Sequence, residues 1–196
     1  MYLHVILYGM PRIRAIPPSE ATGELREVYE SITSSRGKIA AVHTIQSLNP
    51  ASIRDHMALY ATVMFGRSPL SRAEREMIAV TVSAANRCGY CIAHHCEALD
   101  HFWRDRDRVD ALATKGPEHA GLSDREDALC EYARTVTTEP ASGAVADLTT
   151  RLKSLGVEDR GILDASLVVA YFNFVNRIVL SLGVELEPDP GGYRYE

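Results

Sequence analysis

The sequence lacks several features by which common classes of protein are recognised. No apolar run approaches the ~20 residues of a membrane span, and no Gly-rich phosphate loop is present. The first 18 residues have no basic segment before their apolar run and no small-residue cleavage site, unlike a signal peptide. We therefore expect a cytoplasmic protein with no membrane partner, in a compartment that keeps thiols reduced.

An excess of positive charge is also missing. The chain has 21 Lys and Arg against 26 Asp and Glu, a formal net charge of -5. The Arg-rich run from Arg104 to Arg108 alternates with Asp105 and Asp107, so its charges largely cancel. This balance argues against a nucleic-acid partner.

Strand-like alternation is absent beyond residues 2–8, which we interpret as an edge strand or an arm that packs on a neighbour. Hydrophobic residues make up 46% of the chain, enough for one full core. The sequence predicts an all-α, single-domain helical bundle. We expect an N-terminal arm at residues 1–18, a helical domain at 19–188 and a C-terminal tail at 189–196.

Apolar spacing and terminal signals predict the helices. Ser71 with Glu74, and Ser123 with Glu126, match capping boxes, and Gly183 is typical of the end of a helix. The expected helices lie at about residues 22–37, 39–48, 50–66, 71–86, 88–103, 107–115, 123–139, 142–155 and 158–182. Residues 77–85 are apolar or small on every face, which predicts burial all round.

Four cysteines in a cytoplasmic chain of this size do not form a stapling framework. Cys88 and Cys91 form a CxxC, which indicates redox or metal chemistry. One short helix cannot wrap Cys88, Cys91, His94 and His95 tetrahedrally around zinc, and no second CxxC or HxxxH exists. Ile92 stands where haem attachment needs histidine. We therefore expect no metal and no other cofactor.

Thiol redox chemistry fits residues 71–99 better than metal binding does. Cys88 and Cys91 lie on the first turn of a helix, close enough for a disulfide, where the helix dipole favours thiolate. His95 follows one turn along the same stripe, and Glu76 could face it from the preceding helix. Desolvation should raise the pKa of Glu76, which suits a proton shuttle.

The other polar groups of the stretch have simpler interpretations. Tyr90 could supply a hydroxyl for proton transfer or form an aromatic lid. His94 should point elsewhere and be hydrogen-bonded or exposed. Cys96 and Cys130 are expected to be core thiols.

The pattern E-x11-C-x2-C-x3-H, filled by Glu76, Cys88, Cys91 and His95, resembles the alkylhydroperoxidase D family of the carboxymuconolactone decarboxylase superfamily. The match extends to its uncharacterised peroxidase-related branch, which also carries Tyr between the cysteines, here Tyr90. Residues 170–188 resemble the closing helix of that branch.

The resemblance implies a homo-oligomer, a trimer or hexamer, that reduces hydroperoxides without metal or haem and is regenerated by an external dithiol or thiol protein. Carried over, Cys91 is the peroxidatic nucleophile, Cys88 the resolving thiol, and Glu76 with His95 the proton relay. Tyr90 departs from the characterised hydroperoxidases, which place a relay histidine there. A disulfide oxidoreductase or redox sensor for protein partners, a carboxymuconolactone decarboxylase-like enzyme and a non-catalytic helical oligomer are the alternatives.

Overall fold

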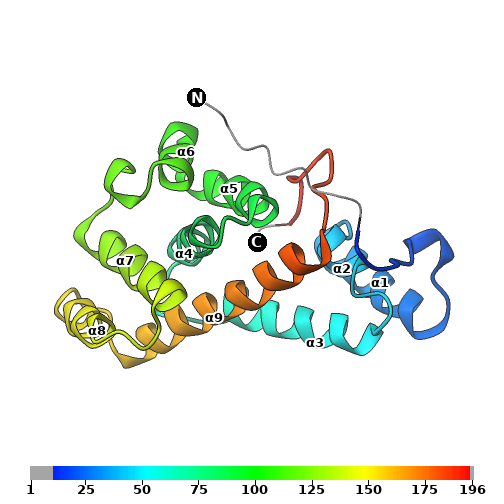
Figure 1. Cartoon of the computed structure of the whole chain (residues 1–196), viewed down its shortest axis with the longest axis horizontal. Coiled ribbons are helices and arrows are strands. Elements are labelled where there is room, and N and C mark those ends of the chain that lie inside the picture. Colours follow the sequence, from blue (N-terminus) through cyan, green and yellow to red (C-terminus); the bar gives the residue numbers. More distant parts are fainter. Residues whose placement is uncertain (1–10, 195–196) are drawn as a thin grey trace.

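The structure is a computed structural model that describes residues 11–194, and over this range it is helical without strands (Figure 1). The elements are α1 (Gly23–Arg36), α2 (Ala41–Thr44), α3 (Pro50–Tyr60), α4 (Arg72–Ala85), α5 (Gly89–Trp103), α6 (Arg106–Thr114), α7 (Asp124–Thr138), α8 (Ala144–Ser154) and α9 (Asp159–Leu182). The all-α prediction is confirmed. The strand or arm expected at residues 2–8 lies outside the described residues.

The residues predicted to begin α4 and α7 and to end α9 do so in the structure. The Ser71 hydroxyl accepts from the Glu74 N–H, and the Glu74 carboxylate accepts from the Ser71 N–H; Ser123 and Glu126 do the same for α7. Gly183, with φ of 67°, ends α9 in the left-handed conformation that glycine adopts without a steric penalty.

Two helices differ from the prediction. The segment expected at residues 39–48 is helical only over the four residues of α2, because the chain then tightens into turns in which the Gln46 and Ser47 N–H groups bond three residues back. The Ser47 hydroxyl accepts from the Ile16 N–H at 2.8 Å and ties this turn to the start of the described chain. Helix α3 continues into a π-helical turn, Ala61–Phe65, before Gly66 ends it.

Helix α4 is the centre of the core and packs against α5, α7 and α9. Residues 77–83 are buried, as their apolar character predicts, and only Ala84 and Ala85 become half-buried as the helix ends at Asn86. Burial on all faces fixes α4 in place and makes it a rigid support for any side chain that it carries.

A short turn joins α4 to α5. Arg87 adopts φ of 56°, and the Cys88 N–H donates back to the Ser83 carbonyl at 2.8 Å. A left-handed non-glycine residue costs about 1–2 kcal/mol, so the surrounding packing must maintain the turn. The turn folds α5 back along α4, which places the middle of α5 beside the first turns of α4.

Helix α9 runs from α8 to α2 (Figure 1). Its length and mean hydropathy of 1.5 would suffice for a membrane span, although we expected no such run. One side nevertheless packs into the core through residues such as Val168, Phe172 and Val179. The opposite side exposes an apolar stripe of Leu163, Leu167 and Phe174.

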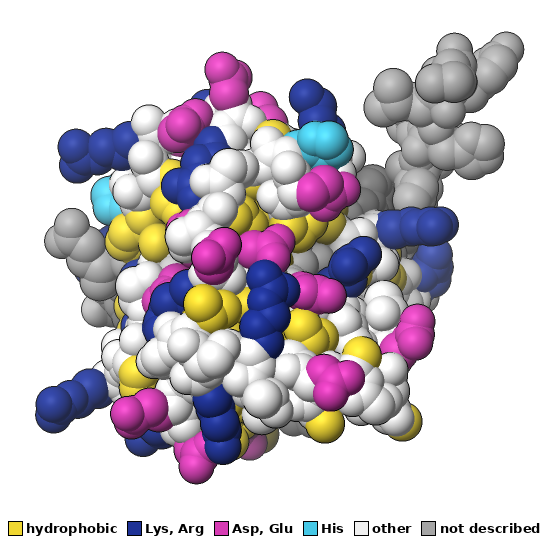
Figure 2. Space-filling model, turned by 90° about the vertical axis from the view of Figure 1, so that its left-hand side faces the viewer, with side chains coloured by type: hydrophobic (Ala, Val, Ile, Leu, Met, Phe, Trp, Pro, Cys, Tyr) yellow, Lys and Arg dark blue, Asp and Glu magenta, His cyan; other side chains and the backbone are white. Residues whose placement is uncertain are grey.

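The chain after Gly183 runs back over the body as a non-helical tail beside α2 and α5 (Figure 1). Lys38 Nζ pairs with Asp189 at 3.1 Å, and Arg36 Nη1 donates to the Arg194 carbonyl at 2.7 Å. At the opposite end, the face over α6–α8 intersperses cationic and anionic side chains and forms no patch of one sign (Figure 2).

Candidate active site

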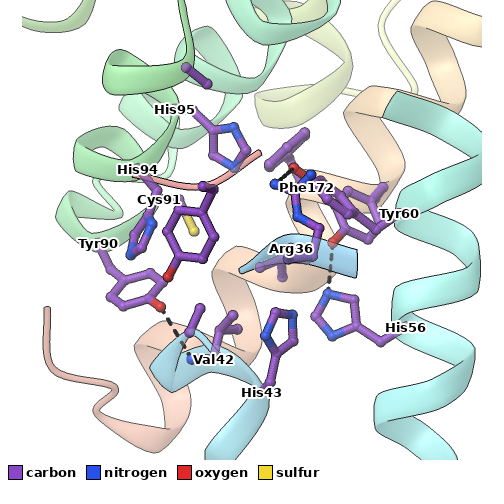
Figure 3. A pocket seen from close by; sticks show the side chains of 15 residues that line it. Arg36, Val42, His43, His56, Tyr60, Tyr90, Cys91, His94, His95 and Phe172 are labelled. Atoms are coloured by element: carbon purple, nitrogen blue, oxygen red, sulfur yellow. Dashed lines mark hydrogen bonds between the residues drawn. The ribbon is translucent and has the colours of Figure 1, made fainter. Parts of the chain in front are cut away.

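A cavity of about 70 Å³ lies between α5, α9, the α1–α3 region and the tail. Figure 3 shows the side chains that surround it. Its wall is aromatic and imidazole-rich, with one sulfur: Arg36, His43, His56, Tyr60, Tyr90, Cys91, His94, His95, Tyr171, Phe172 and Tyr193 all contribute. The predicted site residues Cys91, His95 and Tyr90 therefore meet at one place.

Glu76 and His95 form the first hydrogen-bonded pair of the site. The packing of α4 on α5 places His95 Nδ1 2.6 Å from Glu76 Oε2. The Glu76 side chain is fully buried, and the His95 ring also packs edge-on against Phe172. An ionised carboxylate only accepts, so Nδ1 carries the proton and Nε2 is left to exchange protons.

The expectation that the Glu76 pKa is raised is wrong. Burial does act in that direction, but attraction and hydrogen bonds from His95 and Arg72 outweigh it, and the pKa is lowered. Arg72 lies one helical turn before Glu76, with Nη2 2.5 Å from Oε1, and its guanidinium stacks on Phe65 at 3.7 Å. Glu76 is thus a fixed anion that orients His95, and not itself a proton shuttle.

The two cysteines of the CxxC are free thiols with different surroundings. Cys88 caps α5 and is 0% exposed, whereas Cys91 is 2% exposed and lines the cavity. Only Cys91 can meet a ligand there.

Their pKa values also diverge, although we expected the helix dipole to favour both thiolates. Hydrogen bonding with Cys91 lowers the pKa of Cys88, helped by the N–H groups of Cys91 and Tyr90. The same thiol–thiol bond and burial raise the pKa of Cys91 well above its usual value. The Asn176 side chain opposes this rise. Cys88 is therefore the thiol that loses its proton more easily, and Cys91 is the one that holds its proton.

His94 does not point away from the site. Residues three and four positions after Cys91 flank the same stripe of a helix, and His94 lines the cavity together with His95. Its Nε2 lies 2.8 Å from Oε2 of Glu187, in the tail. The expectation that His94 is hydrogen-bonded is confirmed, but its direction was wrong.

Glu187 is a site residue that the sequence did not reveal. Its Oε1 accepts from the Tyr90 hydroxyl at 2.9 Å and from the Ala41 N–H. Burial opposes ionisation, but hydrogen bonds from His94 and from the Ala41 N–H lower the Glu187 pKa to about 2. Burial and this carboxylate raise the pKa of Tyr90 far above its usual value, so Tyr90 stays protonated.

Two further histidines form the opposite wall. His56 Nε2 lies 2.7 Å from the Tyr171 hydroxyl, and its Nδ1 lies 2.9 Å from Gln46 Nε2. His43 Nδ1 is buried and has no hydrogen-bond partner among the described residues. Burial lowers their pKa values to about 3 for His43 and about 4 for His56, so both are neutral. No pattern in the sequence marked either residue.

The remaining cysteines are core thiols. Cys96 and Cys130 are buried, and burial raises both pKa values to about 12. Thr81 Oγ1 lies 3.3 Å from the Cys130 sulfur. Among residues 11–194, no group of three or more His, Cys, Asp and Glu side chains is arranged to hold a metal ion.

Comparison with known proteins agrees with the central motif. Residues 50–134 match the model of the carboxymuconolactone decarboxylase family. This segment contains Glu76, Cys88, Cys91 and His95. The matched segment lies within an AhpD-like fold. No curated protein matches the sequence.

Solved structures extend the likeness to the whole AhpD-like fold. An uncharacterised peroxidase-related protein from Silicibacter is 27% identical, with a TM-score of 0.80 over 94% of this chain and 96% of its own. One described as an alkylhydroperoxidase AhpD core, from Ralstonia eutropha, is 22% identical, with a TM-score of 0.81 over 92% and 94%. The debrominase Bmp8 shares the fold at 18% identity, with a TM-score of 0.73 over 90% and 92%.

Proposed function

We propose that the protein is a thiol-dependent peroxidase that reduces hydroperoxides through Cys88 and Cys91. The observation that carries this proposal is one cavity in which a dithiol sulfur lies beside a histidine fixed by a buried carboxylate. A thiol needs an adjacent base to become a nucleophile. Peroxidase-related relatives on the same fold agree with this chemistry.

The proposed reaction begins at Cys91. His95 Nε2 accepts a proton from the pair, and the proton that remains shifts along the thiol–thiol bond to Cys88. The Cys91 thiolate attacks the terminal peroxide oxygen and becomes a sulfenic acid, while the peroxide is reduced to an alcohol or water. Cys88 then condenses with the sulfenic acid, which releases water and forms a disulfide. A small external dithiol reduces that disulfide.

Burial of the dithiol favours this function over disulfide exchange with protein partners. Exposed fractions of 0% for Cys88 and 2% for Cys91 leave no sulfur on the surface for a folded protein to attack. A small peroxide fits the cavity of about 70 Å³, which is less than half the roughly 150 Å³ that holds benzene in an engineered cavity. The fold alone would equally accommodate a decarboxylase, but the dithiol has no use in that reaction.

The test is the oxidation state of each cysteine after one equivalent of hydrogen peroxide or alkyl hydroperoxide. We expect a Cys88–Cys91 disulfide by peptide mapping, and continued peroxide consumption when a dithiol is supplied. Cys91→Ser should lose both, and Cys88→Ser should permit a single round. The matched control is Cys130→Ala, which removes a thiol outside the cavity. A fully reduced pair after peroxide treatment would exclude the proposal.

A further inference from the structure

The site contains two carboxylate–imidazole pairs, and the proposed reaction has so far used only Glu76 and His95. The second pair consists of Glu187 from the tail and His94 from α5, joined at 2.8 Å. In Figure 3, His94 and His95 project from α5 beside the Cys91 sulfur. Both rings line the same cavity.

The two carboxylates bind different nitrogens of their histidine rings. Glu76 binds Nδ1 of His95, whereas Glu187 binds Nε2 of His94. Each ionised carboxylate accepts a hydrogen bond, so His94 carries a proton on Nε2 and has Nδ1 left to exchange. Among the described residues, His94 forms its hydrogen bond through Nε2, and the Glu187 carboxylate accepts from His94, Tyr90 and the Ala41 N–H.

Peroxide reduction requires two proton transfers of opposite direction. The attacking thiol loses a proton, and the leaving alkoxide gains one when the O–O bond breaks. An alkoxide is a poor leaving group, so a nearby acid accelerates this step. The two transfers can be divided between two imidazoles, and two of the histidines that line the cavity are each held by a carboxylate.

We propose that His94, positioned by Glu187, donates the proton to the leaving oxygen while His95 serves the attacking thiol. This division of labour rests on the proposed peroxidase function. The S–O bond forms between Cys91 and the terminal oxygen, the O–O bond breaks, and two electrons pass from sulfur to the peroxide. His94 enters the step as an imidazolium, gives its Nδ1 proton to the alkoxide, which leaves as the alcohol, and keeps its Nε2 proton, which is hydrogen-bonded to Glu187. The proton that His95 removed is returned to His94 through solvent.

Tyr90 and the tail explain how His94 is held. The Tyr90 ring packs on the His94 ring with centroids 4.5 Å apart, and its hydroxyl donates to the same carboxylate. The hydroxyl oxygen in turn accepts from the Val42 N–H at 3.2 Å. Tyr90 is thus a positioning residue for Glu187, and neither a proton donor nor a simple lid.

Peroxides with different leaving groups test the proposal. Reduction of methyl hydroperoxide, which is small enough for the cavity, requires protonation of an alkoxide, whereas peracetic acid releases a carboxylate that needs no proton. Stopped-flow reaction of the reduced protein with each peroxide gives the two rates. We expect His94→Asn and Glu187→Gln to slow the alkyl hydroperoxide about 100-fold or more and to leave peracetic acid within about twofold. His101→Asn on the same helix and Glu185→Gln in the tail, both exposed, are the matched controls.

The possible outcomes separate the two proposals. Equal slowing of both peroxides in the His94→Asn protein would show a structural or thiol-activating role and overturn the inference, as would no slowing of either. A wild-type protein that reduces neither peroxide would refute the peroxidase function, and the inference with it. His95→Asn should slow both peroxides together, which makes it the positive control for loss of thiol activation.

Discussion

The two carboxylate–imidazole pairs of the cavity each consist of a glutamate and a histidine, but different parts of the chain hold them together. Glu76 and His95 are 19 residues apart on adjoining helices, and Arg72 compensates the fully buried carboxylate. Glu187 and His94 are 93 residues apart, and the half-buried Glu187 carboxylate comes from a non-helical tail and is held by His94, the Tyr90 hydroxyl and a backbone N–H. A helix pair fixes one imidazole permanently, whereas the other keeps its partner only while the tail is docked.

The largest expected difference between the pairs concerns thiolate formation. Glu76→Gln should slow peroxide reduction by about 100- to 10,000-fold, the usual value of general-base assistance, because His95 loses the anion that orients it. Glu187→Gln should leave the thiolate titration unchanged. Stopped-flow peroxide consumption measures the rate, and absorbance at 240 nm across pH measures the thiolate titration of each variant. Glu74→Gln, which keeps the capping box, is the control, and identical curves for all variants would remove Glu76 from thiol activation.

The second-largest expected difference between the two regions is in the free energy of unfolding. Arg72→Met leaves the fully buried Glu76 without its cation, and breaking such a pair costs about 3–5 kcal/mol. Lys38→Met breaks the tail's pair with Asp189, whose side chains are 31% and 81% exposed, and should cost under about 1 kcal/mol. Urea unfolding measures both values. Similar costs for the two variants would mean that Glu76 is neutral in the folded protein.

His56, which is hydrogen-bonded to Tyr171 and Gln46, sharpens the same comparison. The pKa of His56 is about 4 in the folded protein against 6.5 in the unfolded chain. A lowered folded pKa gives stability that is complete above pH 6.5 and is lost as pH falls toward 4. Between pH 7 and pH 5, His56 should account for roughly 2 kcal/mol of this loss. Urea unfolding of His56→Gln should show a shallower pH dependence, and the exposed His101→Gln should not.

Substitutions in the apolar stripe of α9 should have the smallest effect on the two carboxylate–imidazole pairs. Leu163, Leu167 and Phe174 are 53%, 40% and 44% exposed, and we propose that a second copy of the chain covers them. Light scattering should give a multiple of 21.6 kDa. Leu167→Glu should weaken assembly and leave thiolate formation unchanged. A wild-type mass of one chain at micromolar concentration would rule this out.

Helical spacing explains why one pair was predictable. Cys88, Cys91 and His95 lie on a single stripe, and a short turn brings Glu76 opposite them, so local geometry specifies the group. Helical spacing also places Arg72 one turn before Glu76. Its guanidinium, together with His95, reverses the pKa shift that burial of Glu76 alone would cause. Capping boxes and glycines likewise defined α4, α7 and α9 closely.

Glu187 could not be found in this way. It follows the last helix in a segment without periodicity, and only the tertiary fold brings it to His94. The cavity wall of His43 and His56 depends similarly on the packing of α2 and α3 against α9. Local patterns carry no information on contacts that form across the core.

Burial of both sulfurs has a kinetic consequence for repeated turnover. Once Cys88 and Cys91 are joined, the disulfide lies behind the cavity wall, and a reductant reaches it only through local opening of the surrounding segments. Regeneration, and not attack on peroxide, would then be rate-limiting. Steady-state rates should saturate at low peroxide concentration and follow the size and concentration of the reductant.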